Sequence, residues 1–125
     1  MVLRNLSYCS SSMHGIKQQQ ATLVSSMKAP YEGLRVLDLS DRHSGAFAAR
    51  LFGDFGAEVI LVERREGHPL RSEPPFLDGE PGPDRSVMHA FNNWNKKSVV
   101  VDEHEEFADL VASADVVITL SLIHI

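Results

Sequence analysis

Four short apolar runs recur along the second part of the chain, and polar or glycine-containing segments bound each of them. They are LRVLDLS (34–40), EVILVE (58–63), SVVVD (98–102) and DVVIT (115–119). Continuous apolar runs of this length are typical of strands buried on both faces of a sheet. The pattern therefore predicts four buried strands.

Helical spacing separates these runs. GAFAARLFGDFG (45–56) carries apolar residues three and four positions apart, with Gly56 placed to end a helix in the left-handed conformation. The residues that this spacing assigns to the buried face are Phe47, Ala48, Leu51, Phe52 and Phe55. EEFADLVASA (105–114) is amphipathic, with Phe107, Leu110 and Val111 on one face, and VMHAFNNWNKK (87–97) predicts a short helix or turn.

Strand, helix and strand within about 30 residues form a βαβ unit, whose crossover makes the strands parallel and right-handed. Its repetition predicts an α/β fold with a doubly wound parallel sheet, a class whose ligands bind beyond the carboxyl ends of the strands.

Three segments lie outside this pattern. Residues 1–28 are rich in Ser and Gln and contain no Asp or Glu, which predicts a disordered leader. The leader is either a transit peptide or upstream sequence before a natural start at Met27. Residues 64–86 hold five of the six prolines, so this link is either functional or mobile. The chain then ends in LSLIHI directly after a strand, and we expect it to be truncated there.

Composition narrows the possible functions. A chain of 125 residues with 43% hydrophobic residues can bury one modest core, which indicates one domain or a piece of one. A net charge of -5 argues against a general nucleic-acid binder. The single cysteine, Cys9, excludes an intrachain disulfide and favours a reducing, cytoplasmic location. No run approaches the ~20 apolar residues of a membrane span.

The loop after the first strand, SDRHSGAFAA, lies where a dinucleotide fold keeps its phosphate-binding glycines, but only Gly45 is present. Glu63 lies at the position of a ribose-binding acid, yet without those glycines an NAD site is not favoured. Arg64 and Arg65 follow the second strand, where they either bind phosphate or form solvated pairs with neighbouring acids. Arg71 and Arg85 could converge on the same anion.

NNWNKKS (92–98) also allows two interpretations. In the first, Lys96 or Lys97 binds a nucleotide and Trp94 stacks on its base. In the second, the asparagines make turn hydrogen bonds, the lysines are solvated and Trp94 caps the core. The six histidines show no metal-ligand spacing, so no metal site is predicted. Asp38 lies within its strand and is interpreted as structural. No convincing nucleophile is visible.

Taken in order, four segments resemble the N-terminal part of the family III CoA-transferases: PYEGLRVLDLS, SGAFAARLFGDFGAEVILVE, NKKSVVVD and ADVVI. The corresponding family patterns are P-L-x-G-[IVL]-x-V-L-D, G-A-[DE]-V-[IV]-x-[VI]-E and N-x-N-K-[RK]-S-[VIL]-x-[LV]-D. The resemblance covers residues 30 to 118. The family includes formyl-CoA transferase, the carnitine and bile-acid CoA-transferases and the α-methylacyl-CoA racemases.

The resemblance implies a Rossmann-like large domain, of which residues 29–125 are the incomplete N-terminal part, and an interlocked homodimer for the full-length parent. It implies coenzyme A and acyl-CoA as substrates and a carboxylic acid as acceptor. The family's catalytic aspartate lies beyond the end of this chain, so no catalytic residue is assigned here and this part alone is expected to be inactive. Two alternatives stay open: a racemase-type acyl-CoA enzyme and a non-catalytic nucleotide-binding module.

The resemblance also implies CoA-binding positions. Arg64 matches the arginine that meets CoA phosphate in the family. His43 and Ser44 match the pair at the first strand tip, where transferases often carry Gln-Ala. Val101 and Asp102 match a segment that lines the adenosine end of the site. Beyond the fourth strand the family usually reads E-N-F-x-P-G, where this chain has TLSLIHI.

Overall fold

The computed structural model describes residues 27–102 and 104–120, and the structural statements below concern those residues. The predicted leader at 1–28 lies outside them except for its last two residues, and Cys9 lies outside them entirely. Residues 121–125, where the chain is expected to be truncated, also lie outside them.

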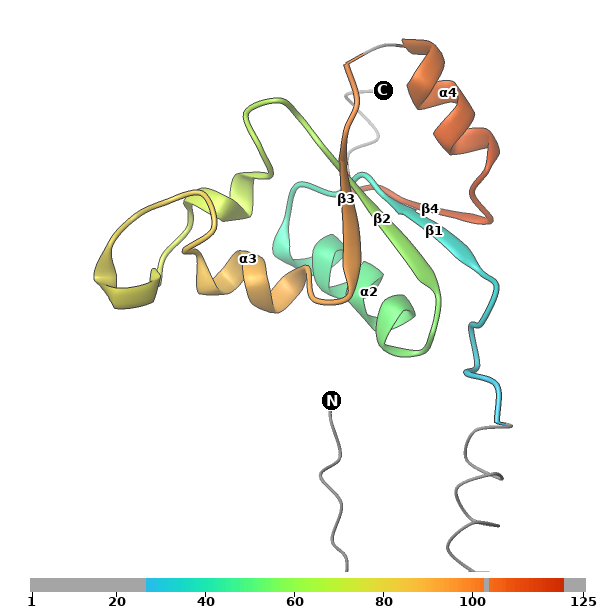
Figure 1. Ribbon diagram of the computed structural model, residues 1–125, viewed down its shortest axis with the longest axis horizontal. Coiled ribbons are helices and arrows are strands. Elements are labelled where there is room, and N and C mark those ends of the chain that lie inside the picture. Colours follow the sequence, from blue (N-terminus) through green and yellow to red (C-terminus); the bar gives the residue numbers. More distant parts are fainter. Residues whose placement is uncertain (1–26, 103, 121–125) are drawn as a thin grey trace, which may run out of the picture.

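The described strands form one parallel sheet with the order β3-β2-β1-β4 (Figure 1). They are β1 (Arg35–Asp38), β2 (Glu58–Glu63), β3 (Lys96–Val100) and β4 (Val116–Ile118). The bounds of β2 are those that the apolar run predicts. The predicted α/β class with a parallel sheet is confirmed, and the arrangement is that of an incomplete Rossmann-like sheet.

Among the described residues three α-helices accompany the sheet: α2 (His43–Asp54), α3 (Val87–Asn92) and α4 (His104–Ala112). The crossover from β1 to β2 and the crossover from β3 to β4 run in opposite directions along the sheet. Because such crossovers are right-handed, α2 and α4 lie on opposite sides of the strands, as Figure 1 shows. The direction changes between β1 and β4, which is the point where open α/β sheets bind ligands.

Helix α2 packs on the sheet through its small residues. Gly45, Ala46 and Ala49 are buried, whereas Phe47, Leu51 and Phe55, predicted as core residues, are exposed. A Cβ atom on Gly45 would lie 2.4 Å from the Cβ atom of Ser40. The predicted buried face is therefore wrong for its largest members, because Phe47, Leu51 and Phe55 lie on the side of the helix opposite the small residues that face the sheet.

The prediction of burial is also wrong for the outer strands. Residues of β3 and β4 are half-buried or exposed, and Val100 and Val117 keep about half of their surface accessible. The two strands form the edges of the described sheet, whereas β1 and β2 have a neighbour on each side. An apolar run alone does not tell an edge strand from a central one.

The proline-rich segment 64–86 is structured. It contains two short 3-10 turns, η1 (Pro69–Ser72) and η2 (Leu77–Gly79), and an isolated bridge joins Phe76 to Ser86. The Arg85 guanidinium donates to the carbonyl oxygen of Leu77 at 2.8 Å. Arg85 therefore stabilises its own turn, and its convergence with Arg71 on an anion stays a prediction.

Candidate functional site

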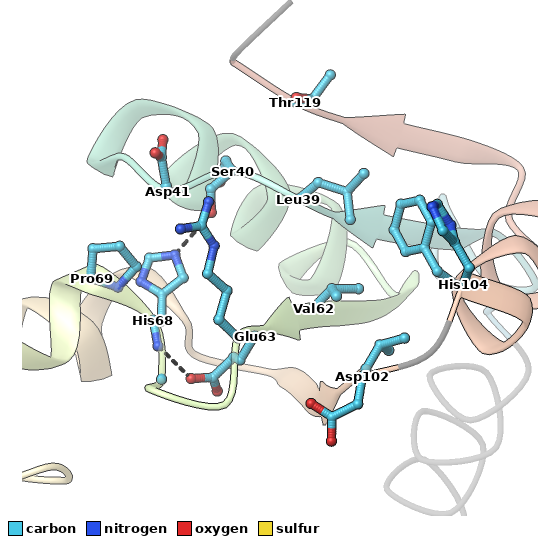
Figure 2. A pocket seen from close by; sticks show the side chains of 14 residues that line it. Leu39, Ser40, Asp41, Val62, Glu63, His68, Pro69, Asp102, His104 and Thr119 are labelled. Atoms are coloured by element: carbon cyan, nitrogen blue, oxygen red, sulfur yellow. Dashed lines mark hydrogen bonds between the residues drawn. The ribbon is translucent and has the colours of Figure 1, made fainter. Parts of the chain in front are cut away.

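A pocket of about 700 Å³ lies at the carboxyl ends of the strands (Figure 2). Its lining comes from the ends of all four described strands, from the turn after β2 and from α4. The lining residues are Leu39, Ser40, Asp41, Val62, Glu63, Arg64, Gly67, His68, Pro69, Val101, Asp102, His104, Phe107 and Thr119. The pocket therefore lies where the strand order predicts a ligand site.

Apolar and polar groups share this lining. Val62, Val101 and Phe107 come from three different elements and offer apolar surface, while Arg64 contributes a permanent positive charge. A pocket that combines apolar walls with a few placed polar groups is typical of small-molecule sites.

The acids in the lining have basic partners of their own. Glu63 pairs with Arg71, and Asp102 pairs with Arg65 through a 2.5 Å contact to a guanidinium nitrogen. Asp41 lies 3.8 Å from the Nε atom of Arg42. These pairs offset most of the negative charge that would otherwise repel an anion from the pocket.

Arg64 differs from the other arginines around the pocket. Within residues 27–102 and 104–120 its side chain makes no hydrogen bond and no ion pair, and it is exposed. Its backbone is fixed, because its carbonyl oxygen accepts from the Gly67 amide at 2.8 Å. Arg64 is therefore a cation with a fixed main chain and an available guanidinium.

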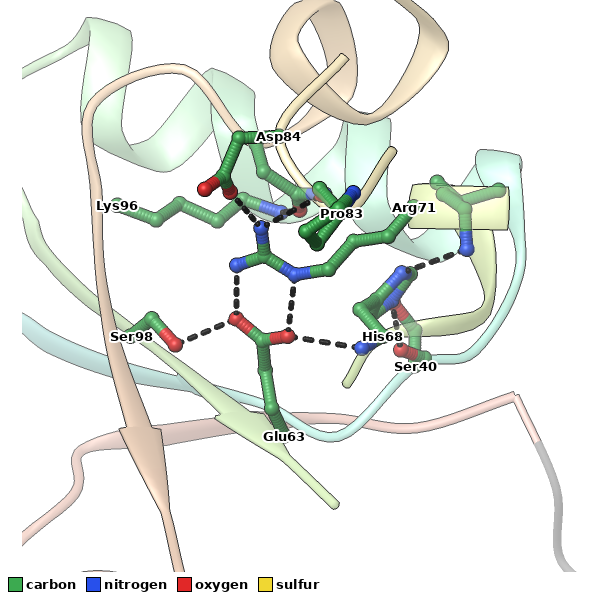
Figure 3. A network of polar contacts seen from close by, with 10 residues as sticks. Ser40, Glu63, His68, Arg71, Pro83, Asp84, Lys96 and Ser98 are labelled. Carbon is green, nitrogen blue, oxygen red and sulfur yellow. Dashed lines mark hydrogen bonds and ion pairs between the residues drawn. The ribbon is translucent and has the colours of Figure 1, made fainter. Parts of the chain in front are cut away.

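The carboxylate of Glu63 is saturated by donors (Figure 3). Arg71 donates to both carboxylate oxygens, at 2.8 and 2.7 Å, the His68 amide donates at 2.8 Å, and the Ser98 hydroxyl also donates. These bonds, the Arg71 fork first, lower the pKa of Glu63 from 4.5 to about 2. No acceptor position is left for a ribose hydroxyl, which agrees with the prediction against an NAD site.

His68 ties the same turn to the tip of β1. Its Nδ1 atom accepts from the Leu70 amide at 3.1 Å, so the hydrogen of the neutral ring is on Nε2, which donates to the Ser40 carbonyl oxygen at 2.9 Å. The ring of His89 lies 5.7 Å from that of His68. Burial, and then the charge of Arg71, lowers the pKa of His89 to about 4, so this ring is neutral near pH 7.

Asp38 and Lys96 form a second buried pair. Their side chains are 0% and 1% exposed, and the Lys96 ammonium donates to Asp38 at 2.7 Å, to the Ala46 carbonyl at 2.7 Å and to the Asn93 amide oxygen at 2.8 Å. Burial lowers the pKa of Lys96. The interpretation of Asp38 as structural is confirmed.

This pair overturns both interpretations of NNWNKKS for Lys96, whereas the turn that the second one predicts is present, with Asn95 at φ +63°, and Lys97 is 73% exposed as that interpretation expects. Lys96 does not grip a nucleotide, nor is it solvated, because it fills a buried position between β1 and α2. Lys97 pairs with Glu58 at 2.7 Å, and Trp94 is 62% exposed, so it does not cap the core. The motif serves the scaffold.

The structure brings together three of the five positions that the resemblance assigns to CoA. Arg64, Val101 and Asp102 line the pocket. Two other positions, His43 and Ser44, are not among its lining residues; His43 contacts Glu73 at 2.6 Å and Asn92 at 3.3 Å, and Ser44 is exposed at the start of α2. Their assignment to a CoA site stays a prediction.

Sequence reasoning missed the turn 67–69 as part of the site. Gly67 has φ +90°, and Pro69 begins a 3-10 turn that His68 caps. A glycine followed two positions later by a proline is a recognisable signal for a turn with such geometry. Phe107 and Thr119 were missed because their place in the pocket depends on the strand order.

Neither a metal-binding cluster nor a membrane-spanning helix occurs in the described part of the chain. No cluster of three or more His, Cys, Asp or Glu side chains that could hold a metal ion occurs there. No helix among residues 27–102 and 104–120 is long and apolar enough to cross a membrane.

The fold is that of an α/β protein with a pocket at the carboxyl ends of its parallel strands. Compared with protein families, residues 31–120 match CoA-transferase family III. The chain belongs to this family, as the resemblance predicts.

Individual relatives agree. The chain is 38% identical over 93 residues to a succinyl-CoA:mesaconate CoA-transferase of Haloarcula hispanica, which covers 70% of this chain and 23% of that protein. It is 48% identical over 79 residues to the succinyl-CoA:glutarate CoA-transferase of Mus musculus, covering 62% of this chain and 17% of that protein. The chain thus spans about a quarter or less of the length of these relatives.

A solved structure shows the same fold. A CaiB/BaiF family protein from Brucella suis superposes with a TM-score of 0.63 at 35% identity, covering 74% of this chain and 26% of that chain.

Proposed function

We propose that residues 29–125 form the CoA-binding N-terminal part of the large domain of an enzyme that transfers CoA between carboxylic acids. The observation that carries this proposal is the pocket at the carboxyl edge of the sheet, where Arg64 has no partner among the described residues. The family match and the printed activities of the relatives support it.

The ligand's chemistry suits the lining. The adenosine end of CoA takes the apolar surface of Val101 and Phe107, and a phosphate group takes the guanidinium of Arg64. Asp102 holds Arg65 by an ion pair, so in this proposal it shapes the rim of the adenosine end. His43 and Ser44 approach CoA from the start of α2 only where the bound ligand extends past the pocket.

Acyl-CoA and a carboxylic acid are the proposed substrates, and an interlocked homodimer is the proposed assembly of the full enzyme. In the family, covalent catalysis by an aspartate carboxylate splits the exchange into steps. The proposal assigns no nucleophile among residues 1–125, requires no metal, and expects no transfer activity from this part alone. A cytoplasmic location is part of the same proposal.

Calorimetric titration of the chain with CoA and, separately, with NAD tests the proposal. We expect binding of CoA, no binding of NAD, and about tenfold weaker CoA binding for Arg64→Ala, because one charge-assisted contact to phosphate is lost. Arg85→Ala is the matched control, since it removes an arginine of the same segment that does not line the pocket. Binding of NAD, or unchanged CoA affinity of Arg64→Ala, contradicts the proposal.

A further inference from the structure

The turn after β2 closes on its own strand. Glu63, the last residue of β2, accepts from the His68 amide five positions later and from the Arg71 side chain eight positions later. Arg64 to Gly67 lie inside this closed segment, and a 2.8 Å bond from the Gly67 amide to the Arg64 carbonyl tightens it further. The backbone of Arg64 is thus held from both sides.

Arg71 is well suited to close the turn. Its planar fork meets both oxygens of Glu63, and its Nη1 atom also donates to Asp84 at 2.7 Å. The Glu63 carboxylate is 3% exposed, so it is shielded from water and needs these donors. The fork satisfies the carboxylate internally and leaves neither residue free to bind a ligand.

Two neighbouring elements anchor the same turn. The Ser98 hydroxyl of β3 donates to Glu63, and the His68 ring donates to Ser40 after β1. The turn is therefore fixed to three adjacent strands, while the Arg64 guanidinium, on the pocket side, has no partner in the described residues.

We infer that Glu63 and Arg71 are positioning residues, whose ion pair closes residues 64–71 onto the end of β2 and so holds Arg64 at the pocket for an anionic group of the ligand. The inference rests on the proposed function for the identity of that ligand as CoA. It assigns no direct ligand contact to either Glu63 or Arg71.

A double-mutant cycle on the chain tests this inference, with CoA affinity as the readout. We expect Glu63→Gln to weaken CoA binding about tenfold when Arg64 is present, and less than about twofold in the Arg64→Ala background. A merely structural defect would weaken binding equally in both backgrounds. Equal losses in the two backgrounds overturn the inference.

A second variant covers the case in which Glu63→Gln does not fold, judged by circular dichroism. Arg71→Lys keeps the charge and one donor but loses the fork, and we expect the same dependence on Arg64. Arg85→Ala, the matched loss of an arginine outside the pocket, is expected to change CoA affinity in neither background. An effect of Arg71→Lys that does not depend on Arg64 contradicts the inference.

Failure of the proposed function can be told apart from failure of this inference. If the chain binds no CoA, the proposed function fails, and the cycle is repeated with inorganic pyrophosphate as the probe. Pyrophosphate binding that weakens on Glu63→Gln only when Arg64 is present supports the inference by itself. Pyrophosphate binding that is absent or indifferent to Arg64 overturns it.

Discussion

Two polar regions lie next to each other in sequence at the tip of β2, and they differ in their burial and in their bonding partners. The buried region is centred on Glu63, whose carboxylate is 3% exposed and holds Arg71 and Ser98. The exposed region consists of Arg64, which has no partner among the described residues, and Arg65, which is 76% exposed and pairs with Asp102. The buried region maintains the fold, and Arg64 in the exposed region is the residue that the proposed function assigns to the ligand.

The comparison extends to the family motifs. Asp38 from the first motif pairs with Lys96 from the third, and Glu63 from the second pairs with Ser98 from the third. The residues that make the motifs recognisable are therefore largely bonded to one another inside the protein. The following predictions test this division between scaffold and site.

The largest loss of folding stability is expected when the Asp38–Lys96 pair is broken. Lys96→Met keeps the apolar stem but leaves the buried Asp38 carboxylate without its counter-charge, which should lower the free energy of unfolding by about 3–5 kcal/mol. Urea denaturation measures the change. Lys97→Met is the matched control, because its side chain is 73% exposed and its loss should hardly move the midpoint. Equal effects of the two variants contradict a scaffold role for Lys96.

Low pH should reduce the stability of the fold through protonation of Glu63, which breaks its bonds with Arg71, His68 and Ser98. The folded-state pKa of Glu63 is about 2, below its ordinary 4.5, so its stabilisation is present above pH 4.5 and is lost as the pH falls towards 2. The shift corresponds to about 3 kcal/mol. Urea midpoints between pH 7 and pH 2.5 should fall less steeply for Glu63→Gln than for the unaltered chain. Parallel pH profiles for the two chains would falsify this account.

A smaller effect is expected at Gly67. Its φ of +90° strains any other residue, and an added Cβ would lie 3.2 Å from the Arg71 Cδ atom. Gly67→Ala should therefore lower the free energy of unfolding by about 1–2 kcal/mol, measured by thermal or urea denaturation.

Gly79→Ala separates backbone strain from crowding. Gly79 also has a positive φ, +72°, but an added Cβ would meet no atom within 4 Å. We expect the loss at Gly79 to be about 1 kcal/mol from strain alone. A loss at Gly79 as large as that at Gly67 would show that crowding against Arg71 contributes nothing.

The smallest effect on stability is expected at Arg65. Its ion pair with Asp102 is solvent-exposed, so Arg65→Ala should leave the urea midpoint unchanged within error. A clear loss of stability would show that the exposed region also belongs to the scaffold.

Much of the fold was predictable from local pattern. The run EVILVE marks β2 within its observed bounds, and the helical spacing before it marks α2. Burial was less predictable: Phe47 and Phe55 follow the helical period but stay exposed, because they lie on the side of α2 opposite the small residues that face the sheet. Periodicity reports which residues share a face, whereas the packing of the helix on the sheet decides which face is buried.

The candidate site was likewise predictable from the sequence only in part. Sequence by itself determined that a cationic residue follows β2, that the glycines of an NAD site are missing, and that the motifs are those of the CoA-transferase family. Only the tertiary structure decided that Arg71, and not a ligand, satisfies Glu63, that Lys96 is buried against Asp38, and that Arg64 is left available at the pocket. The reason is physical: the number of donors around a charge depends on residues far away in sequence, 58 positions for Lys96 and Asp38, and only folding brings them within hydrogen-bonding distance.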